Sequence, residues 1–439
     1  MFDNLFSKDN HKPIEFINSP EETPIGAEKF SMQKQKESFG GSSYELKTPF
    51  CIAYMEKMKK QYPENVPGMK VILENIDKQY IQNFDLIKSD KFPGTEISYT
   101  RLSVTPQLIK DISSAYSDHS ASGSELPADP EIEIDQAKKE VAFIFPAMGL
   151  PPDGNAFSAE DIGIDRFIRF IPRVTRAMRE GQPTPEVEIY VLGSGTGFGE
   201  KVSADFVKQV DDRGLDARGE YYAEFVNNIL KDEDADHILL QGASMGTMAA
   251  DFVFSSLPDE VKKKTQRLFD SPAGNHDPSI INRWRGVQAG IGVVVEGGIN
   301  FFSETGKAAT KYRPELIKHI LEQKGQTTET EENKNNRFQL FKAAGKKLLQ
   351  GEPLDLSERT YIRRGEKDLL TFSPIRFIRN SLRRGTKIET HHGDAAEIKV
   401  PMKTTGRALE VPNRKAHIFS FENFARWNTI IDYSKKVTG

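Results

Sequence analysis

The sequence predicts an α/β protein whose sheet is mainly parallel and is covered by helices on both faces. Short apolar runs of strand length alternate with longer segments of helical periodicity along most of the chain. The clearest strand signals are the apolar runs Glu140–Pro146, Glu186–Leu192 and His237–Gln241. Strands that alternate with helices are joined by right-handed crossovers, and such crossovers build a parallel sheet.

The chain up to residue 93 is predicted to be an N-terminal arm and helical extension outside the main fold. Residues 1–45 are polar and contain several prolines and a glycine–serine run, a composition typical of a poorly ordered arm. The phenylalanines in this arm suggest that parts of it dock on the body of the protein. Two helices are expected to follow, at residues 48–61 and 68–82.

The main fold is expected to begin with an alternating strand at residues 95–104, followed by a polar loop at 113–130. A series of strands joined by helices then follows. These strands are predicted at 131–135, 140–146, 186–192, 237–241, 267–270 and 359–364. The helices are predicted at 162–180, 200–231 and 247–255.

One motif lies between a strand and a helix: Gly242-x-Ser244-x-Gly246 joins the apolar run 237–241 to the helix expected from Thr247. Glycine is needed at both outer positions, because a Cβ there would collide with the packed strand or helix. The turn resembles the nucleophile elbow of the α/β-hydrolase family, in which a strained backbone projects a serine Oγ from the top of the sheet. A chance occurrence of the pattern in an ordinary loop is the alternative interpretation.

A serine hydroxyl becomes a good nucleophile only when a histidine takes its proton and a carboxylate orients that histidine. In the α/β-hydrolase family these residues follow in the order serine, acid, histidine. Asp368, in a Gly-Glu-Lys-Asp turn after the strand predicted at 359–364, resembles the acid of the family, with an ordinary turn hydrogen bond as the alternative. His417 precedes an amphipathic helix expected at 421–433 and resembles the family's histidine. The resemblance therefore implies Ser244, Asp368 and His417 as the catalytic residues.

The choice of histidine leaves an alternative. The family's histidine usually follows the eighth strand closely, and residues 386–389 could form that strand, which would make His391 or His392 the base. The segment after His392 does not lead into the C-terminal helix, whereas the segment after His417 does. We therefore expect His417 to be the base and residues 393–412 to form an inserted loop or hairpin.

The resemblance also implies an oxyanion hole, in which two backbone N–H groups are preorganised for the charge that develops on the carbonyl oxygen. One donor is the N–H of Met245, directly after the serine. The other would come from the loop after the strand at 140–146. Many members of the family have His-Gly-x-Pro there, whereas this chain has Met-Gly-Leu-Pro, so Leu150 is the expected donor. The missing histidine leaves residues 147–149 as alternatives.

Residues 276–357 are predicted to form a helical insertion, because they carry helical periodicity and no strand signal. Ile280, Trp284 and Val287 recur at helical spacing near its start. The α/β-hydrolase family commonly has a cap over its site at this place, which implies that these three residues line the substrate pocket. A helical packing layer with no gating role is the alternative. Two further helices are expected, at 312–324 and 336–350.

Two sequence features could indicate a cofactor or a metal, but both signals are weaker than the Gly-x-Ser-x-Gly motif. Residues 193–199 are rich in glycine and follow a strand, but they match neither the dinucleotide nor the P-loop spacing, so we expect no nucleotide cofactor. His391, His392 and Asp394 could ligate a metal, but adjacent histidines point apart on a strand and there is no second cluster. We therefore expect neither a cofactor nor a metal.

Composition narrows the class of protein. The formal net charge is −4 and the pI is near 6.2, which argues against a nucleic-acid partner. The single cysteine, Cys51, permits no intrachain disulfide, and the N-terminus lacks the apolar region of a secretory signal. The most apolar stretch, Gly290–Phe302, is too short to span a bilayer. We expect a cytoplasmic protein without a membrane span that acts on a small-molecule ester or acyl substrate.

The resemblance covers roughly residues 95–437 and implies the α/β-hydrolase fold, with a mostly parallel eight-stranded sheet, helices on both faces and a helical cap after the sixth strand. The function that it implies is that of a serine hydrolase cleaving a carboxylic ester. An acyltransferase or peptidase with the same triad, and a catalytically silent binding protein, are the alternatives. The expected boundaries are 1–93 for the extension, 94–275 for the first part of the core, 276–357 for the cap and 358–439 for the rest of the core.

Overall fold

The structure is a computed structural model of the chain, which divides into the units Met1–Leu46 and Lys47–Gly439. Every described residue belongs to the second unit. The structure describes the following residue ranges without a gap: 66–114, 139–147, 180–270, 316–326, 329–350, 360–365 and 396–400. Residue 314 and the helical residues 163–164, 166–167, 170–171, 174 and 177–178 are described as well.

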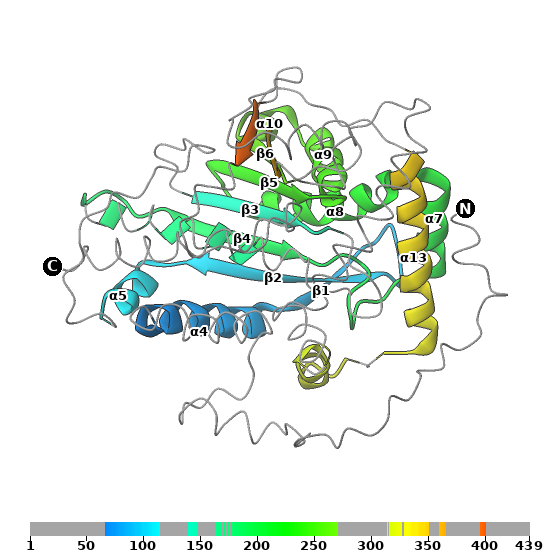
Figure 1. Ribbon diagram of the computed structural model, residues 1–439, viewed down its shortest axis with the longest axis horizontal. Helices are drawn as coiled ribbons and strands as arrows, with labels where there is room; N and C mark the ends of the chain where they lie inside the picture. Colours follow the sequence, from blue (N-terminus) through cyan, green and yellow to red (C-terminus); the bar gives the residue numbers. More distant parts are fainter. Residues whose placement is uncertain are drawn as a thin grey trace, which may run out of the picture. The chain divides into compact units, whose positions relative to one another are not determined.

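The strands form one sheet in the order β1-β2-β4-β3-β5-β6-β7-β8 (Figure 1). All neighbouring strands from β4 to β8 pair in parallel, whereas β2 runs antiparallel to both β1 and β4. The predicted fold class, a mostly parallel sheet in an α/β protein, is confirmed. The strands are β1 Asp85–Lys88, β2 Glu96–Val104, β3 Lys139–Phe145, β4 Glu186–Leu192, β5 His237–Ala243, β6 Thr265–Asp270, β7 Thr360–Gly365 and β8 Ala396–Val400.

Helices connect the strands and cover both faces of the sheet. Val141, Phe143 and Phe145 of β3 point to one face and share a buried cluster with residues of α7, α8 and α9. On the other face, α4 packs on β2, and the helical residue Gly163 lies against Val191 of β4. The helices are α4 Val66–Asn83, α5 Pro106–Ser114, α7 Ala204–Arg213, α8 Asp216–Asp232, α9 Gly246–Ser256, α10 Asp259–Lys263 and α13 Glu331–Gln350.

The pairing register aligns the carboxyl ends of the central strands at one edge of the sheet. Phe145 of β3 pairs with Gly242 of β5, and Ala243 pairs with Asp270 of β6. Beyond β6, Asp270 pairs with Arg363 of β7, and Gly365 at the end of β7 pairs with Val400 at the end of β8. The segments that follow β3, β5, β6, β7 and β8 therefore all leave the sheet at this edge, which is called the carboxyl edge below.

Two strands, β1 and β8, lie where the sequence analysis predicts no strand. β1 lies within residues 1–93, so the sheet begins before the predicted boundary at residue 94. Its four residues, Asp-Leu-Ile-Lys, are too few to show a period. β8 lies inside residues 393–412, for which an inserted loop or hairpin is predicted, and it pairs in parallel with β7. Ala-Glu-Ile-Lys-Val alternates apolar and charged residues, and that period of two is the sequence signal for it.

Most other predicted elements agree to within a few residues. The helix predicted at 200–231 is two helices, α7 and α8, separated at Gly214. The two later helices of the insertion are seen as helical residues between 314 and 323 and as α13. α5 and α10 were not predicted. The helix expected at 48–61 and the strand expected at 131–135 lie outside the described residues.

Candidate active site

Ser244 occupies a strained turn between β5 and α9. Its φ is 50°, and it is the one non-glycine residue with positive φ in the described part of the chain. This left-handed conformation disfavours a residue with a side chain and persists only where the surrounding contacts impose it. The carbonyl oxygen of Ser244 accepts two bonds from Thr247, from its backbone N–H at 3.2 Å and its hydroxyl at 2.6 Å. These bonds fold the first residues of α9 back over the serine.

The two flanking glycines have no room for a side chain. A Cβ on Gly242 would lie 2.6 Å from the backbone nitrogen of Thr247. A Cβ on Gly246 would overlap the carbonyl oxygen of Phe145 and lie 2.6 Å from that of Pro146. The predicted steric reason for both glycines is therefore confirmed. The contacts of Gly246 also place the end of β3, where the predicted oxyanion loop begins, directly against the start of α9.

Burial distinguishes Ser244 from its neighbours. Residues 241–243 and 245–250 are all buried, whereas Ser244 is only half-buried. Met245, whose N–H is a predicted oxyanion donor, is 4 % exposed and is the N-cap residue of α9. The helix dipole at this N-terminus favours negative charge beside the serine. The turn therefore places a half-buried serine at the N-terminus of α9.

A buried charged pair that the sequence analysis does not predict connects α9, the helix that follows Ser244, to the neighbouring strand β6. Arg267 of β6 is fully buried and forms an ion pair with Asp251 of α9. Its guanidinium also stacks over the ring of Phe254, with its carbon 4.1 Å from the ring centroid. This group attaches α9 to β6 on the face that the helix covers. A charged residue inside an apolar strand run, Gln-Arg-Leu-Phe, is the sequence signal for it.

The glycine-rich turn after β4 is organised around the carboxylate of Glu200. Glu200 is 1 % exposed, and its carboxylate accepts hydrogen bonds from the N–H of Ser98 at 3.0 Å, from the hydroxyl of Ser98 at 2.7 Å and from the N–H of Gly197. A Cβ on Gly193 would collide with Glu200 and Ser98. Because a protein carboxylate already takes the Gly197 N–H, this turn is not suited to bind a phosphate.

A tyrosine connects this turn to the end of β3. The hydroxyl of Tyr222, in α8, donates to the carbonyl oxygen of Gly193 at 2.6 Å. Its ring meets that of Phe145 edge to face, with centroids 5.6 Å apart. Burial raises the pKa of the Tyr222 hydroxyl.

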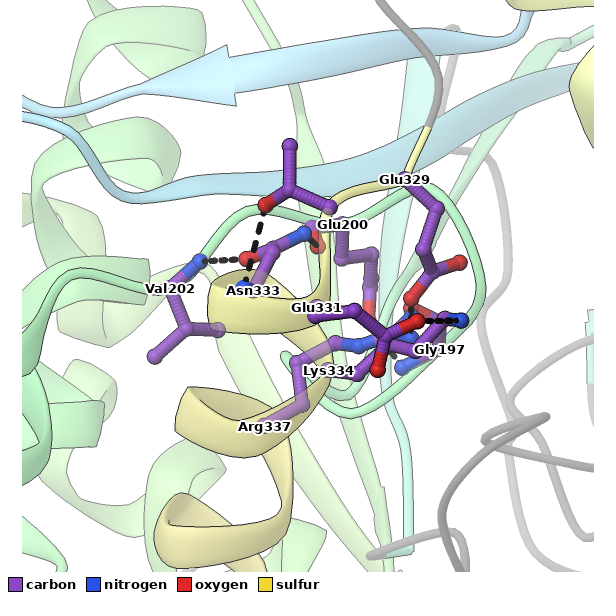
Figure 2. A network of polar contacts seen from close by, with 9 residues as sticks. Gly197, Glu200, Val202, Glu329, Glu331, Asn333, Lys334 and Arg337 are labelled. Carbon is purple, nitrogen blue, oxygen red and sulfur yellow. Dashed lines mark hydrogen bonds and ion pairs between the residues drawn. The ribbon is translucent and has the colours of Figure 1, made fainter.

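Helix α13, from the predicted cap, is fastened to the same turn (Figure 2). Asn333 donates to the carbonyl oxygen of Glu200 at 2.6 Å and accepts from the N–H of Val202 at 2.9 Å. Arg337 donates to the carbonyl oxygen of Gly197 and pairs with Glu329, and these two charged side chains are 1 % and 6 % exposed. α13 also packs along α7, as Figure 1 shows at the end of the sheet.

The preceding helical residues reach this turn as well. Ile317 and Leu321 are buried against Gly199, where a Cβ would lie 2.7 Å from Leu321. Lys324 forms an ion pair with Asp85 of β1. Both later helices of the insertion are therefore built into the body of the protein, which fits the alternative of a packing layer for this half of residues 276–357.

The Arg337 anchor should contribute strongly to stability. We expect Arg337→Met to lower the free energy of unfolding by about 3 kcal/mol or more, because it leaves the buried Glu329 carboxylate without its cation. Lys346→Met removes a matched but exposed pair between α13 and α7, with Asp211 2.9 Å away, and should cost at most about 1 kcal/mol. Urea unfolding of both variants checks the difference. Equal losses would contradict the structural importance of the buried pair.

The remaining predicted site residues lie outside the described part of the chain. This holds for Asp368 and His417 of the triad and for Leu150 of the oxyanion hole. It holds equally for the three predicted substrate-binding residues, Ile280, Trp284 and Val287. Their roles stay predictions. The structure places the ends of the strands that precede Asp368 and His417, at Gly365 and Val400.

Two kinds of site are absent from the described part of the chain. Within the ranges that the structure covers, no group of three or more histidine, cysteine or acidic side chains is arranged to hold a metal ion. Among the same residues, no helix is both long and apolar enough to span a membrane.

The comparisons with known proteins give matches to solved structures. No protein-family profile and no curated protein matches the chain. A thermophilic esterase from Thermogutta terrifontis aligns over 81 % of this chain and 99 % of its own, with 14 % identity and a TM-score of 0.32. A proline iminopeptidase-related protein from Thermus thermophilus aligns over 81 % and 96 %, with 9 % identity and a TM-score of 0.33. An α/β hydrolase enzyme from a Medee basin deep-sea metagenome library aligns over 72 % and 89 %, with 9 % identity and a TM-score of 0.31.

The fold class follows from the arrangement of the sheet and its helices, and not from the similarity to these solved structures. A mostly parallel sheet carries helices on both faces, a serine at a strained turn after β5 and a helical insertion after β6. This is the arrangement predicted for the α/β-hydrolase fold, and the fold class of the chain is therefore that of the α/β hydrolases.

Proposed function

We propose that the chain is a serine hydrolase that cleaves a carboxylic ester through an acyl-enzyme on Ser244. The observation that carries this proposal is the turn itself. A half-buried serine is held at a φ of 50° by two glycines that touch neighbouring backbone. Backbone strain of this kind concentrates at functional sites, because the surrounding structure has to offset its cost. An ordinary loop would have no need to hold a serine in this conformation.

The strand ends support Asp368 as the acid. Asp368 follows the end of β7 by three residues, and β7 is separated from β5 only by β6. Two strand spacings amount to about 10 Å, a gap that a histidine between the serine and the acid can bridge. The register supports this, because β5 and β7 both end at the carboxyl edge.

The position of β8 supports His417 as the base. His391 and His392 precede β8, so the chain that carries them enters the sheet from the edge opposite Ser244. The chain that follows β8 and carries His417 starts from Val400, at the carboxyl edge where β5 also ends. The order of serine, acid and histidine after β5, β7 and β8 is the order that the family resemblance implies.

The chemistry follows from these roles. His417 takes the proton of Ser244 as Oγ attacks the acyl carbon, and Asp368 orients the histidine and stabilises its charge. The oxyanion of the tetrahedral intermediate accepts hydrogen bonds from the N–H of Met245 and from a second donor, proposed to be Leu150. The intermediate expels the alcohol, which leaves with the proton from His417. Water, activated by His417, then attacks the acyl-enzyme and releases the acid.

A fluorophosphonate probe tests this proposal most directly, because it reacts with an activated serine and remains attached. Peptide mapping of the labelled protein should find the modification on Ser244 alone. Labelling elsewhere, or none, would favour a catalytically silent protein with the same fold. Turnover with competing alcohol and amine acceptors would then distinguish a hydrolase from an acyltransferase.

We propose further that the first half of the insertion covers the site. The insertion leaves the sheet at Asp270, and Arg337 is fastened to the turn after β4. In the strand order, β5 and β3 lie between β6, which ends at Asp270, and β4, whose following turn holds Arg337. A joining chain that follows the carboxyl edge would pass the strands that carry Ser244 and the start of the oxyanion loop, and this supports the cap proposal.

The cap proposal predicts a change of specificity in Trp284→Ala. Trp284 is proposed to line the acyl pocket with Ile280 and Val287, so its removal should shift the preference among p-nitrophenyl esters of different acyl length. The melting temperature should stay close to that of the parent protein while the preferred acyl length changes, because a pocket residue contributes more to binding than to folding. Superimposable chain-length profiles of the two proteins would exclude Trp284 from the pocket.

A further inference from the structure

The guanidinium of Arg218, near the start of α8, is buried with most of its donors unused. Arg218 is 1 % exposed. A guanidinium carries N–H groups on three nitrogens, and Nη2 of Arg218 donates to the hydroxyl of Tyr222 at 3.2 Å. Its Nε and Nη1 are buried as well, and neither has a hydrogen-bond partner among the described residues. The side chain therefore brings a positive charge into the protein and leaves two nitrogens without an acceptor.

The other deeply buried arginines in the described ranges each have a strong acceptor. Their pairs are Arg166 with Gln241, Arg267 with Asp251 and Arg337 with Glu329. The buried carboxylate of Glu200 does not play this part for Arg218, since its hydrogen bonds come from Ser98 and Gly197. Burying a charge without a counter-ion destabilises the folded state, so such a residue is expected where its free donors serve a ligand.

The free donors lie at the carboxyl edge of the sheet. The Cζ of Arg218 is 5.4 Å from the centroid of the Tyr222 ring. The Tyr222 hydroxyl, which accepts from Arg218, donates in turn to the carbonyl oxygen of Gly193, the first residue after β4. The same ring contacts Phe145, the last residue of β3. The guanidinium is therefore held beside the ends of β3 and β4.

Ser244 lies at the same edge, two strands away from β4. Only β3 separates β4 from β5, the strand that Ser244 directly follows. Two strand spacings amount to about 10 Å, which places the free donors on the order of 10 Å from the serine turn. Phe145 connects the two places, because its ring contacts Tyr222 and its carbonyl oxygen lies against Gly246. One substrate molecule with two functional groups can span this distance.

A carboxylate is the group that fits these donors. The second hydrogen of Nη2 lies beside a hydrogen of either Nε or Nη1, so one edge of the guanidinium still offers two parallel N–H groups. Two such groups match the two oxygens of a carboxylate, and the bonds are strengthened where water is excluded. One guanidinium also balances one negative charge, which suits a carboxylate better than a doubly charged phosphate.

We propose that Arg218 is a specificity-determining residue that binds a carboxylate of the substrate while Ser244 attacks the ester. The substrate class is then an ester with a free carboxylate on the order of 10 Å from the reacting carbonyl carbon. A half-ester of a dicarboxylic acid and an ester of a hydroxy acid both have this chemistry, and the test separates them. This inference rests on the proposed function and names its substrate class.

The test measures kcat/KM for pairs of esters that differ only in the carboxylate. Monomethyl suberate and its terminal amide place the group on the acyl side, and ω-acetoxyoctanoate and its amide place it on the alcohol side. Titration of the released acid follows all four reactions. The variants are Arg218→Met and, as the matched control, Arg213→Met, which removes an exposed arginine of α7 that pairs with Glu220 at 2.8 Å.

The parent protein should prefer the carboxylate over the amide by about 30-fold or more in kcat/KM in one of the two pairs, because the charged ester alone pairs with the buried guanidinium. The pair that shows the preference identifies the side of the ester that Arg218 recognises. Arg218→Met should bring the ratio within about threefold of unity, whereas Arg213→Met should leave it unchanged. A ratio is used because it cancels any general loss of turnover.

Two readouts do not depend on turnover. The Ser244→Ala protein should bind the preferred carboxylate ester in isothermal titration calorimetry, and adding Arg218→Met should weaken this binding by about 30-fold or more. In the absence of ester, Arg218→Met should raise the melting temperature of the parent protein, because methionine replaces an uncompensated buried charge with an apolar side chain. An arginine that serves only packing would give a lower melting temperature.

Several outcomes overturn the inference. A parent protein that does not distinguish carboxylate from amide in either pair has no carboxylate subsite. A preference that survives Arg218→Met, or that Arg213→Met removes equally, assigns recognition to other groups. Failure of the proposed function looks different: the parent hydrolyses none of the four esters, while calorimetry still shows whether a carboxylate binds at Arg218. If calorimetry also shows no binding that depends on Arg218, the inference fails as well.

Discussion

Ser244→Ala should abolish ester hydrolysis and fluorophosphonate labelling, with a loss of turnover on the order of 10³–10⁶-fold. The substitution removes only the hydroxyl oxygen, and the bonds that hold the turn use the backbone carbonyl of Ser244 and not its side chain. The fold should therefore persist. Steady-state kinetics with p-nitrophenyl esters, together with circular dichroism of both proteins, provide the measurement.

Ser244→Gly is the control that separates the hydroxyl from the strained backbone. Glycine adopts positive φ freely, so this variant should be as inactive as Ser244→Ala yet more stable than it by about 1 kcal/mol. If the Ser244→Ala protein hydrolyses esters like its parent, Ser244 is not the nucleophile. A glycine variant no more stable than the alanine variant would argue that the turn is unstrained.

His417→Ala should lose at least about 10³-fold in turnover at neutral pH, as expected when the general base is removed. The base takes the serine proton in acylation and activates water in deacylation, so both steps fail. His392→Ala is the matched substitution, because His392 belongs to the alternative pair ahead of β8. It should lose less than about tenfold, since no proton transfer depends on it.

The reverse order of these losses would reassign the base to the pair at 391–392. It would also require the chain before β8 to reach the carboxyl edge, contrary to the parallel pairing of β7 and β8. Equal and small losses would mean that neither histidine is the base, and the triad would have to be rebuilt from another residue. A pH profile of kcat/KM for each variant separates loss of a base from loss of folded protein.

The central strands and the elbow could be predicted because their signals are local. Glu186–Leu192 was predicted with its observed bounds, and the tight contacts of Gly242 and Gly246 follow from a five-residue pattern between an apolar run and a helix. β8 also has a local signal, the alternation in Ala396–Val400. The prediction nevertheless placed the candidate strand before His391, because the family's histidine usually follows the eighth strand closely.

The polar contacts that hold the site could not be predicted, because their partners are far apart in the sequence. Arg166 and Gln241 are 75 residues apart, and Arg337 and Gly197 are 140 apart. Nothing in the local sequence of Gln241 indicates that an arginine will cover it. The helical character of residues 336–350 was predictable from periodicity, whereas their attachment to the turn at Glu200 depends on the completed fold.

The attachment of α13 has a consequence for a chain broken between β6 and the helix at Leu316. A single cut within residues 271–313 would leave Ser244 on the first fragment and Asp368 and His417 on the second. The second fragment would still hold the first through the β6–β7 ladder and through Asn333 and Arg337. Neither fragment alone contains all three residues of the proposed triad. Two fragments made separately would therefore regain ester hydrolysis only on reassociation, and enzyme turnover would become a direct readout of fragment binding.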